Sequence, residues 1–155
     1  MKVKIKKFND KAIIPYKTHQ SDFCYDCVAT SCEEVAPNVY KYGLGFGLQI
    51  DRKESVELVN SAINSPINLD IDFRPRSSVW KTGMSLSNCE GTIDEGYINK
   101  ISAVFYHVMP NMPKYEVGDR IGQIKIGVTF PMEFIEVDEL NETDRGLGGF
   151  GSTGK

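Results

Sequence analysis

The chain of 155 residues lacks the hydrophobic segments of membrane proteins and of secreted precursors. No apolar run approaches the roughly 20 residues that span a bilayer. The apolar stretch AIIPY, which follows the basic start MKVKIKKFND, is too short for the central region of a signal peptide. We therefore expect an intracellular, soluble protein of the cytoplasm, with no membrane partner.

The sequence also lacks an excess of basic residues. Its 18 Lys and Arg are outnumbered by 21 Asp and Glu, which gives a net charge of −3. Stable binding of nucleic acid is disfavoured because it depends on a positive surface. A polyphosphate site would have to be built from a few locally placed arginines, backbone N–H groups and a divalent cation.

Cysteine and histidine are too few for a typical zinc site. Cys24 and Cys27 form a C-x-x-C pair, but no second pair and no nearby pair of histidines accompany them. A structural zinc site and a redox-active pair remain as alternatives. Reduced thiols that pack in the interior are the favoured interpretation.

Helix signals are scarce, and short runs rich in β-branched and aromatic residues dominate the chain. The runs that predict strands are VKIKKF, GLGFGLQI, NLDIDF, SAVFYHVM and RIGQIKIGVTF. They favour an all-β fold, a distorted jelly roll or β-sandwich. Residues 54–65 alone show helical spacing, which Pro66 ends. We expect one β domain over residues 1–140 and a flexible glycine-rich arm over residues 141–155.

The segment 145–155 reads RGLGGFGSTGK and is suited to phosphate groups. Its glycines allow backbone N–H groups to approach an anion closely. Arg145 adds a charge, Ser152 and Thr153 add hydroxyl donors, and Phe150 adds a flat ring. The spacing nearly fits a P-loop, but the acidic, turn-like stretch before it does not predict the strand that a P-loop requires. On composition alone, a disordered glycine tail is the alternative.

Polar groups also follow two of the predicted strands earlier in the chain. RPRSSVWKTG places Arg76, Ser77 and Ser78 in succession, which offers a guanidinium fork and two hydroxyls to a phosphate. SNCEGTIDEGYINKI predicts a β-hairpin that carries the carboxylate of Asp94 and the ring of Tyr97. Each signal is weak alone, since serine-rich turns are common and a lone carboxylate is usually solvated.

A third polar segment, VGDRIGQIKI, predicts a turn that leads into a strand. Asp119 and Arg120 are expected to form a structural ion pair, and Gln123 is the candidate for ligand contact.

Taken in order, these segments resemble the motifs of the trimeric dUTPase family, and the resemblance spans residues 24–154. The matching stretches are CYDC at 24–27, PRSS at 75–78, GTIDEGY at 91–97, GDRIGQ at 118–123 and RGLGGFGSTG at 145–154. The resemblance implies hydrolysis of dUTP to dUMP and pyrophosphate by Mg²⁺-assisted attack of water on the α-phosphate. Such an activity limits uracil incorporation into DNA and supplies dUMP for thymidylate synthesis. It also implies a homotrimer in which each active site is shared by three subunits.

The resemblance assigns a role to each matching residue. Asp94 would be the general base, and Asp26 would hold Mg²⁺ through water. The implied substrate contacts are Arg76, Ser77, Ser78 and Gln123 with the phosphates, Asn88, Thr92, Ile93 and Ser102 with uracil, Tyr97 with deoxyribose, and Arg145, Phe150, Gly151, Ser152 and Thr153 in the closing arm.

Two other functions stay open from the residues themselves. A dCTP deaminase on a related fold would share the arginine–serine turn and the trimer. A non-catalytic β module that binds nucleotides would share the phosphate contacts without the chemistry.

Overall fold

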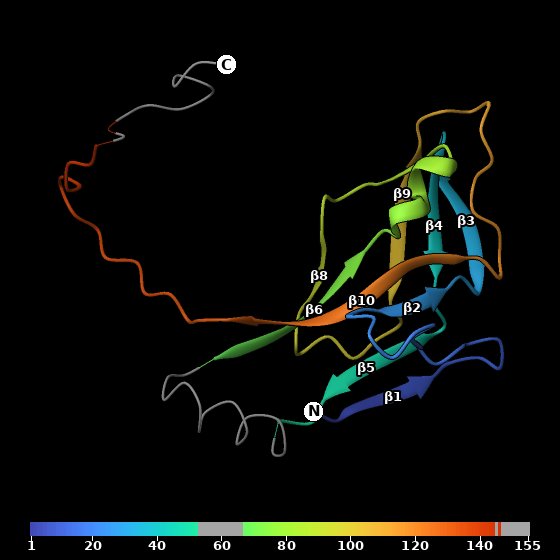
Figure 1. Ribbon diagram of the computed structural model, residues 1–155, viewed down its shortest axis with the longest axis horizontal. Coiled ribbons are helices and arrows are strands. Elements are labelled where there is room, and N and C mark those ends of the chain that lie inside the picture. The colour runs from blue at the N-terminus through green and yellow to red at the C-terminus, as the bar shows by residue number, and fades with distance from the viewer. Residues whose placement is uncertain (53–66, 145, 147–155) are drawn as a thin grey trace.

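The computed structural model describes residues 1–52, 67–144 and 146, and it confirms the all-β fold (Figure 1). The strands are β1 (Val3–Lys7), β2 (Tyr25–Val28), β3 (Ser31–Ala36), β4 (Val39–Gly43), β5 (Phe46–Ile50), β6 (Asn68–Arg74), β7 (Met84–Leu86), β8 (Gly91–Ile93), β9 (Ser102–His107) and β10 (Arg120–Thr129). A short 3₁₀ helix, η1 (Ser77–Lys81), follows β6. The five runs predicted as strands contain β1, β5, β6, β9 and β10, whereas the predicted helix at 54–65 lies outside the described residues.

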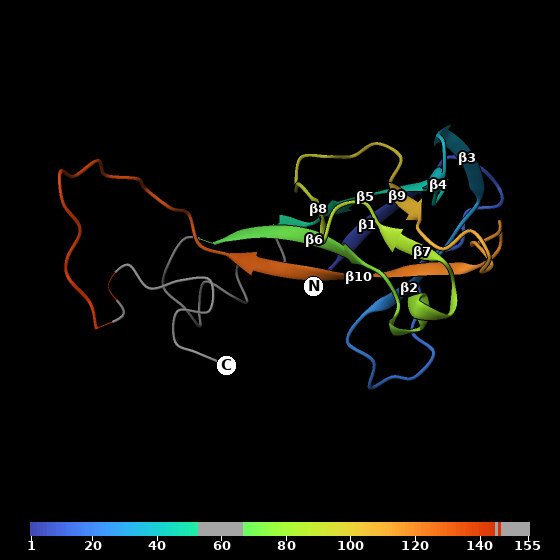
Figure 2. The ribbon, with the colours of Figure 1, turned by 90° about the horizontal axis from the view of Figure 1, so that it is seen from above.

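The strands form two four-stranded antiparallel sheets and one two-stranded sheet. Their orders are β2-β10-β6-β8, β3-β4-β9-β7 and β1-β5. β6 and β10 pair over seven residues, from Asn68↔Thr129 to Arg74↔Gln123, and Figure 2 shows them side by side along the body. This long pairing places the turn after β6 next to the start of β10.

All three sheets contribute to one hydrophobic core. Alternation along β6 buries Leu69, Ile71 and Phe73 in that core and turns Asp70 and Asp72 to the other face. The largest fully buried side chains are Tyr42, Phe46, Phe105, Leu44, Ile121 and Cys27. The two layers and their shared core form the sandwich that the strand pattern predicted.

Cys27 is packed in this core as a free thiol. Burial raises its pKa far above the usual range, and the neighbouring charge of Asp26 adds to the effect. A neutral thiol of this kind is neither a nucleophile nor a metal ligand. Among residues 1–52, 67–144 and 146, no group of three or more His, Cys, Asp or Glu could hold a metal ion.

Residues 130–144 run away from the body after β10 (Figure 1). This stretch exposes Phe130, Met132, Phe134, Ile135, Val137 and Leu140. The division between domain and arm at residue 140 stays a prediction. In the part of the chain that the structure describes, no helix is long and apolar enough to cross a membrane.

Candidate functional site

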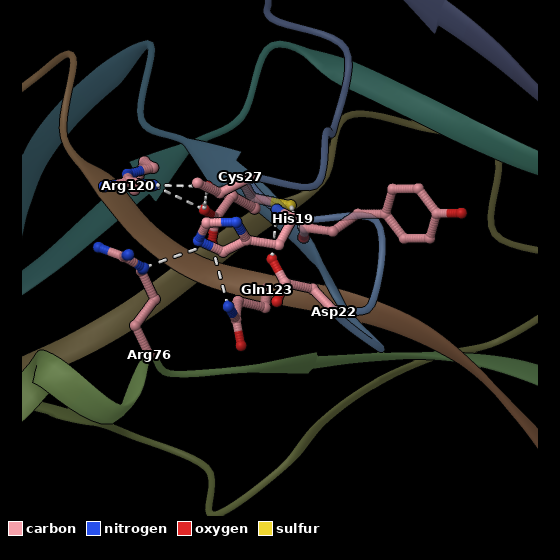
Figure 3. A network of polar contacts seen from close by, with 9 residues as sticks. His19, Asp22, Cys27, Arg76, Arg120 and Gln123 are labelled. Carbon is pink, nitrogen blue, oxygen red and sulfur yellow. Dashed lines mark hydrogen bonds and ion pairs between the residues drawn. The ribbon is translucent and has the colours of Figure 1, made fainter.

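Asp26 lies at the centre of a polar cluster between β2 and β10. It pairs in register with Gln123 and is only 5% exposed. Its Oδ1 accepts a hydrogen bond from Gln123 Nε2 at 3.1 Å, and its Oδ2 accepts one from Arg120 Nη1 at 3.0 Å. Figure 3 shows Arg76, Arg120 and Gln123 converging on this point. We call these four residues, together with Thr18, which bridges Arg120 and Asp26, the Asp26 cluster.

Two arginines share the one carboxylate, so the cluster carries an excess positive charge. Arg76 Nε lies 3.3 Å from Asp26 Oδ1. This nitrogen is buried and makes no hydrogen bond, so the contact is an attraction between charges without the alignment of a hydrogen bond. The side chains of Arg76 and Arg120 are 26% and 37% exposed, which leaves their outer N–H groups open to an anion.

The turn after β6 adds hydroxyl groups beside Arg76. Pro75 and Arg76 follow β6, Arg76 is in extended conformation, and η1 begins at Ser77. Val79 N donates a hydrogen bond to Arg76 O at 2.9 Å, which closes the turn. Ser77 is exposed and Ser78 is half-buried. The structure thus brings Arg76, Ser77 and Ser78 to the end of β6 that pairs with Gln123 of β10.

A separate pocket of about 210 Å³ lies under the hairpin that joins β7 to β9. Of the residues predicted to contact a base, Asn88, Thr92, Ile93 and Ser102 all line it. The remaining lining residues are Phe73, Leu86, Ser87, Gly91, Ala103 and Val104. The lining therefore combines apolar side chains with several polar groups around one small cavity. We call it the hairpin pocket.

Asp94 and Tyr97 stand in the exposed turn after β8, outside the pocket lining. Tyr97 N donates to Asp94 O at 2.9 Å, and the Tyr97 hydroxyl donates to Lys100 O at 2.9 Å. The ion pair between Glu95 and Arg52, at 2.6 Å, ties the turn to the end of β5. Asp94 is thus exposed to solvent on a turn that two hydrogen bonds and an ion pair stabilise.

The register shows that Asp94 is remote from the Asp26 cluster within one chain. β2 and β8 are separated by three strand spacings in the sheet, or about 14 Å. Asp26 and Arg74 pair with the same residue of β10, Gln123, from its two sides. On the far side of β6, Ile93 pairs with Ile71. Continuing that register places Asp94 four residues further along the sheet from Arg74, which adds about 13 Å. A single subunit therefore does not bring the two groups together.

Sequence reasoning assigned Arg120 wrongly and missed Thr18. Arg120 pairs with Asp26 rather than with Asp119, whose carboxylate instead accepts a hydrogen bond from Glu116 N at 2.7 Å. The reason is local geometry, because Asp119 belongs to the turn before β10, where its N–H donates to Glu116 O, whereas Arg120 is the first residue of the strand. The alternation of Arg120 with buried Ile121 could have signalled this direction. Nothing in the sequence links Thr18 to Asp26.

A second charged cluster lies on the outer face of the same sheet, where Asp72 is buried. Burial alone would raise the pKa of Asp72, but the hydrogen bond and charge of Lys125, with help from Arg74, hold that pKa below its usual range. Lys125 Nζ lies 2.9 Å from Asp72 Oδ2. Burial and the negative charge of Asp72 raise the pKa of the neighbouring Asp70. Of the two carboxyl groups, Asp70 is therefore the one whose charged form is disfavoured in the folded protein.

The residues predicted for the closing arm cannot be placed. Arg145, Phe150, Gly151, Ser152 and Thr153 lie outside the described residues. Their roles stay predictions.

Comparison with known proteins agrees with the motifs. A sequence model of the dUTPase family matches residues 45–154. The deoxyuridine 5'-triphosphate nucleotidohydrolase of Clostridium novyi (strain NT) is 36% identical, with 99% of each chain covered. That of Crocosphaera subtropica is 35% identical, again over 99% of each chain. Among solved structures, the dUTPase of Staphylococcus bacteriophage 80alpha with dUPNHPP has a TM-score of 0.75 at 20% identity, covering 99% of both chains.

Proposed function

The chain belongs to the dUTPase family, and on that premise we propose that it hydrolyses dUTP to dUMP and pyrophosphate. The observation that carries the proposal is the hairpin pocket, where Asn88, Thr92, Ile93 and Ser102 meet around one small cavity. These are the residues that the sequence predicts to contact uracil. The alternatives, a dCTP deaminase and a non-catalytic module, have no comparable support.

The pocket is suited to recognise the polar edge of uracil, where the base carries its hydrogen-bond donors and acceptors. Residues of β8 and β9 line the pocket, so that backbone groups of both strands are at hand, and Asn88 supplies an amide that both donates and accepts hydrogen bonds. Cytosine presents the reverse pattern of donors and acceptors, so that buried groups would be left without partners. Tyr97 lies at the end of the same hairpin, where its ring would pack on deoxyribose and collide with a 2′-hydroxyl.

The Asp26 cluster suits the phosphate chain. Arg76 offers N–H groups on a partly exposed guanidinium, Ser77 and Ser78 offer hydroxyls, and Gln123 offers an amide from the neighbouring strand. Phosphate would bind the outer N–H groups of Arg76, while its buried Nε stays against Asp26. The positive charge of two arginines offsets the charge that the leaving pyrophosphate develops.

Asp94 is proposed as the general base. A water hydrogen-bonded to its carboxylate transfers a proton to it while the water oxygen bonds to the α-phosphorus. The bond from that phosphorus to the bridging oxygen breaks, and pyrophosphate leaves. Proton transfer of this kind contributes about 10²–10⁴-fold, and alignment and electrostatics supply the rest.

The remoteness of Asp94 from Asp26 supports a homotrimer with shared active sites. The two groups are about 14 Å apart across the sheet and about 13 Å apart along it, so a phosphate chain held by Arg76 needs the Asp94 of a neighbouring subunit. The apolar side chains exposed over residues 130–140 support the same proposal. A run of that kind is typical of a segment that is covered by another copy.

Mg²⁺ is the proposed cofactor, held mainly by the substrate. Both oxygens of Asp26 already accept hydrogen bonds from Gln123 and Arg120, which disfavours direct coordination and fits contact through water. Mg²⁺ sheds its waters reluctantly and commonly bridges a carboxylate and phosphates in this way. When bound, it offsets phosphate charge. A structural Mg(II) ion is described for a dUTPase variant from phage phi11 of S. aureus.

Residues 145–155 are proposed to close over the bound nucleotide. Arg145, Ser152 and Thr153 would contact the γ-phosphate together with the Gly151 backbone, and Phe150 would stack on uracil. Removal of residues 145–155 should leave the trimer assembled, as measured by light scattering, and should strongly lower turnover. Full activity of the truncated protein would contradict the closing role.

The test of the function is a substrate panel. We expect pyrophosphate release from dUTP with Mg²⁺, and little from dCTP, dTTP, dATP, dGTP or UTP. Ammonia release from dCTP would indicate the deaminase instead. Binding of dUTP without any product would indicate the non-catalytic module.

A further inference from the structure

Phe73 occupies space that is free only because residue 122 is glycine. An ideal Cβ added to Gly122 would lie 2.1 Å from Phe73 Cζ and 2.7 Å from both Cε atoms. These distances are far below van der Waals contact, so the ring of Phe73 rests directly on the backbone of β10. The two residues are diagonal neighbours in the sheet, since Phe73 pairs with Ile124.

The same phenylalanine bounds the hairpin pocket on its other side. Phe73 is one of the pocket's lining residues and pairs in register with Gly91 of β8. A Cβ on Gly91 would lie 3.3 Å from Phe73 Cβ and 3.8 Å from Asn88 Nδ2. Phe73 therefore joins the core to the pocket, with its Cβ beneath the hairpin and the far edge of its ring over Gly122.

The ring has little freedom to move within the core. Phe73 is only 3% exposed and belongs to the core cluster, where Ile71 and Ile124 are also buried. Close-packed interiors contain few voids, and overpacking displaces side chains toward whatever space is free. The free space next to Phe73 is the pocket of about 210 Å³.

We propose that Gly122 and Phe73 together set the depth of the pyrimidine pocket. With glycine at 122, the ring lies over β10 and the space under the hairpin stays open for a base. Any side chain at 122 pushes the ring toward β8 and fills that space. Gly122 and Phe73 are thus specificity-determining residues, although neither belongs to the polar groups that read the base. The inference rests on the proposed function, because it assumes that the pocket receives uracil.

The direct test is Gly122→Ala, with binding of dUMP measured by calorimetry and turnover of dUTP measured by pyrophosphate release. We expect dUMP affinity to fall about ten- to hundredfold, because changes of one carbon in a base pocket have effects of this size. The matched control is Gly127→Ala on the same strand. A Cβ there would meet the Asp70 carboxylate at 2.3 Å on the outer face, so we expect dUMP affinity close to that of the unaltered protein.

A second pair of variants separates pocket depth from damage to the fold. Phe73→Val removes the ring, and combined with Gly122→Ala it relieves the clash, so the double variant should regain at least part of the lost dUMP affinity. Phe73→Val alone should deepen the pocket and raise turnover of dTTP relative to dUTP, because room appears for the 5-methyl group. A merely structural role would lower both turnovers equally.

The outcomes distinguish this inference from the proposed function. If the unaltered protein binds dUMP and the folded Gly122→Ala variant binds it equally well, Gly122 and Phe73 do not set the depth of the pocket, and the proposed function stands. If the unaltered protein neither binds dUMP nor hydrolyses dUTP, the proposed function fails, and the inference fails with it. An unchanged ratio of dTTP to dUTP turnover in Phe73→Val would also overturn the inference.

Discussion

Asp26 on β2 and Arg120 at the start of β10 form an ion pair of 3.0 Å although 94 residues separate them in the chain. Gln123, three residues further along β10 and beyond an irregularity in the pairing with β2, bonds to the other oxygen of the same carboxylate. The carboxylate is therefore held between strands that meet only in the tertiary structure. Its negative charge holds Arg76 and Arg120 in place by ion pairs, and these two arginines would face the phosphate chain.

Arg120→Ala should destabilise the fold moderately. It leaves the buried Asp26 with one arginine, Arg76, which approaches without a hydrogen bond. We expect a loss of about 1–2 kcal/mol in the free energy of unfolding, below the cost of breaking a fully buried pair because Arg120 is partly exposed. Urea unfolding of the variant and of the unaltered protein measures this loss. Lys4→Ala is the control, since the side chain of Lys4 is 66% exposed in its ion pair with Asp51, and a change near zero is expected there.

Asp94→Asn should separate chemistry from binding. The amide keeps the shape of the side chain but cannot take the proton of the attacking water, so turnover should fall by about 10²–10⁴-fold while dUTP binding survives. Single-turnover pyrophosphate release and calorimetry report the two quantities. Asp10→Asn, at another exposed carboxylate, should change neither. Unaltered turnover in Asp94→Asn would falsify the assignment of the base.

Mixed trimers should reveal whether the site is shared between subunits. Chains carrying Asp94→Asn and chains carrying Arg76→Ala are each expected to be nearly inactive alone. Unfolded together in equal amounts and refolded, they should regain activity, because about one quarter of the shared sites in a symmetric trimer receive an intact Asp94 and an intact Arg76 from different chains. Absence of any recovery in verified mixed trimers would place both groups of each site in one chain.

Asp70→Asn should stabilise the protein near neutral pH. The folded pKa of Asp70 is raised above its ordinary value of 3.8 by burial and by Asp72, so the folded state loses stability as pH rises through the raised pKa. The amide removes that ionisation, and we expect a gain of roughly 0.5–1 kcal/mol at pH 7. The gain should shrink toward pH 3.8, where the carboxyl is increasingly protonated in both states.

Urea unfolding from pH 7 to pH 4 measures this effect. Glu33→Gln on the exposed face of β3 is the control and should show little change at any pH. A gain for Asp70→Asn that did not decline with falling pH would show that the ionisation of Asp70 is not its cause.

The sequence alone determined the class of fold and which short segments carry the candidate site residues. Alternation of apolar and polar residues specifies which face of a strand is buried, and this local property located β1, β5, β6, β9 and β10. The resemblance to the family's motifs assigned Asn88, Thr92, Ile93 and Ser102 to uracil. They line one pocket because they belong to one short segment, which a hairpin brings together by its own turn.

The tertiary structure decided which distant groups meet. Strand order and register place Asp26 against Arg120 and Gln123, and they separate it from Asp94 by the width of a sheet. They also seat Phe73 on Gly122, a contact that no pattern along the chain encodes because it depends on how two strands lie side by side. Local sequence specifies the strands, whereas their pairing follows from burying all of their apolar faces at once, and this pairing decides the depth of the pocket and the surroundings of Asp26.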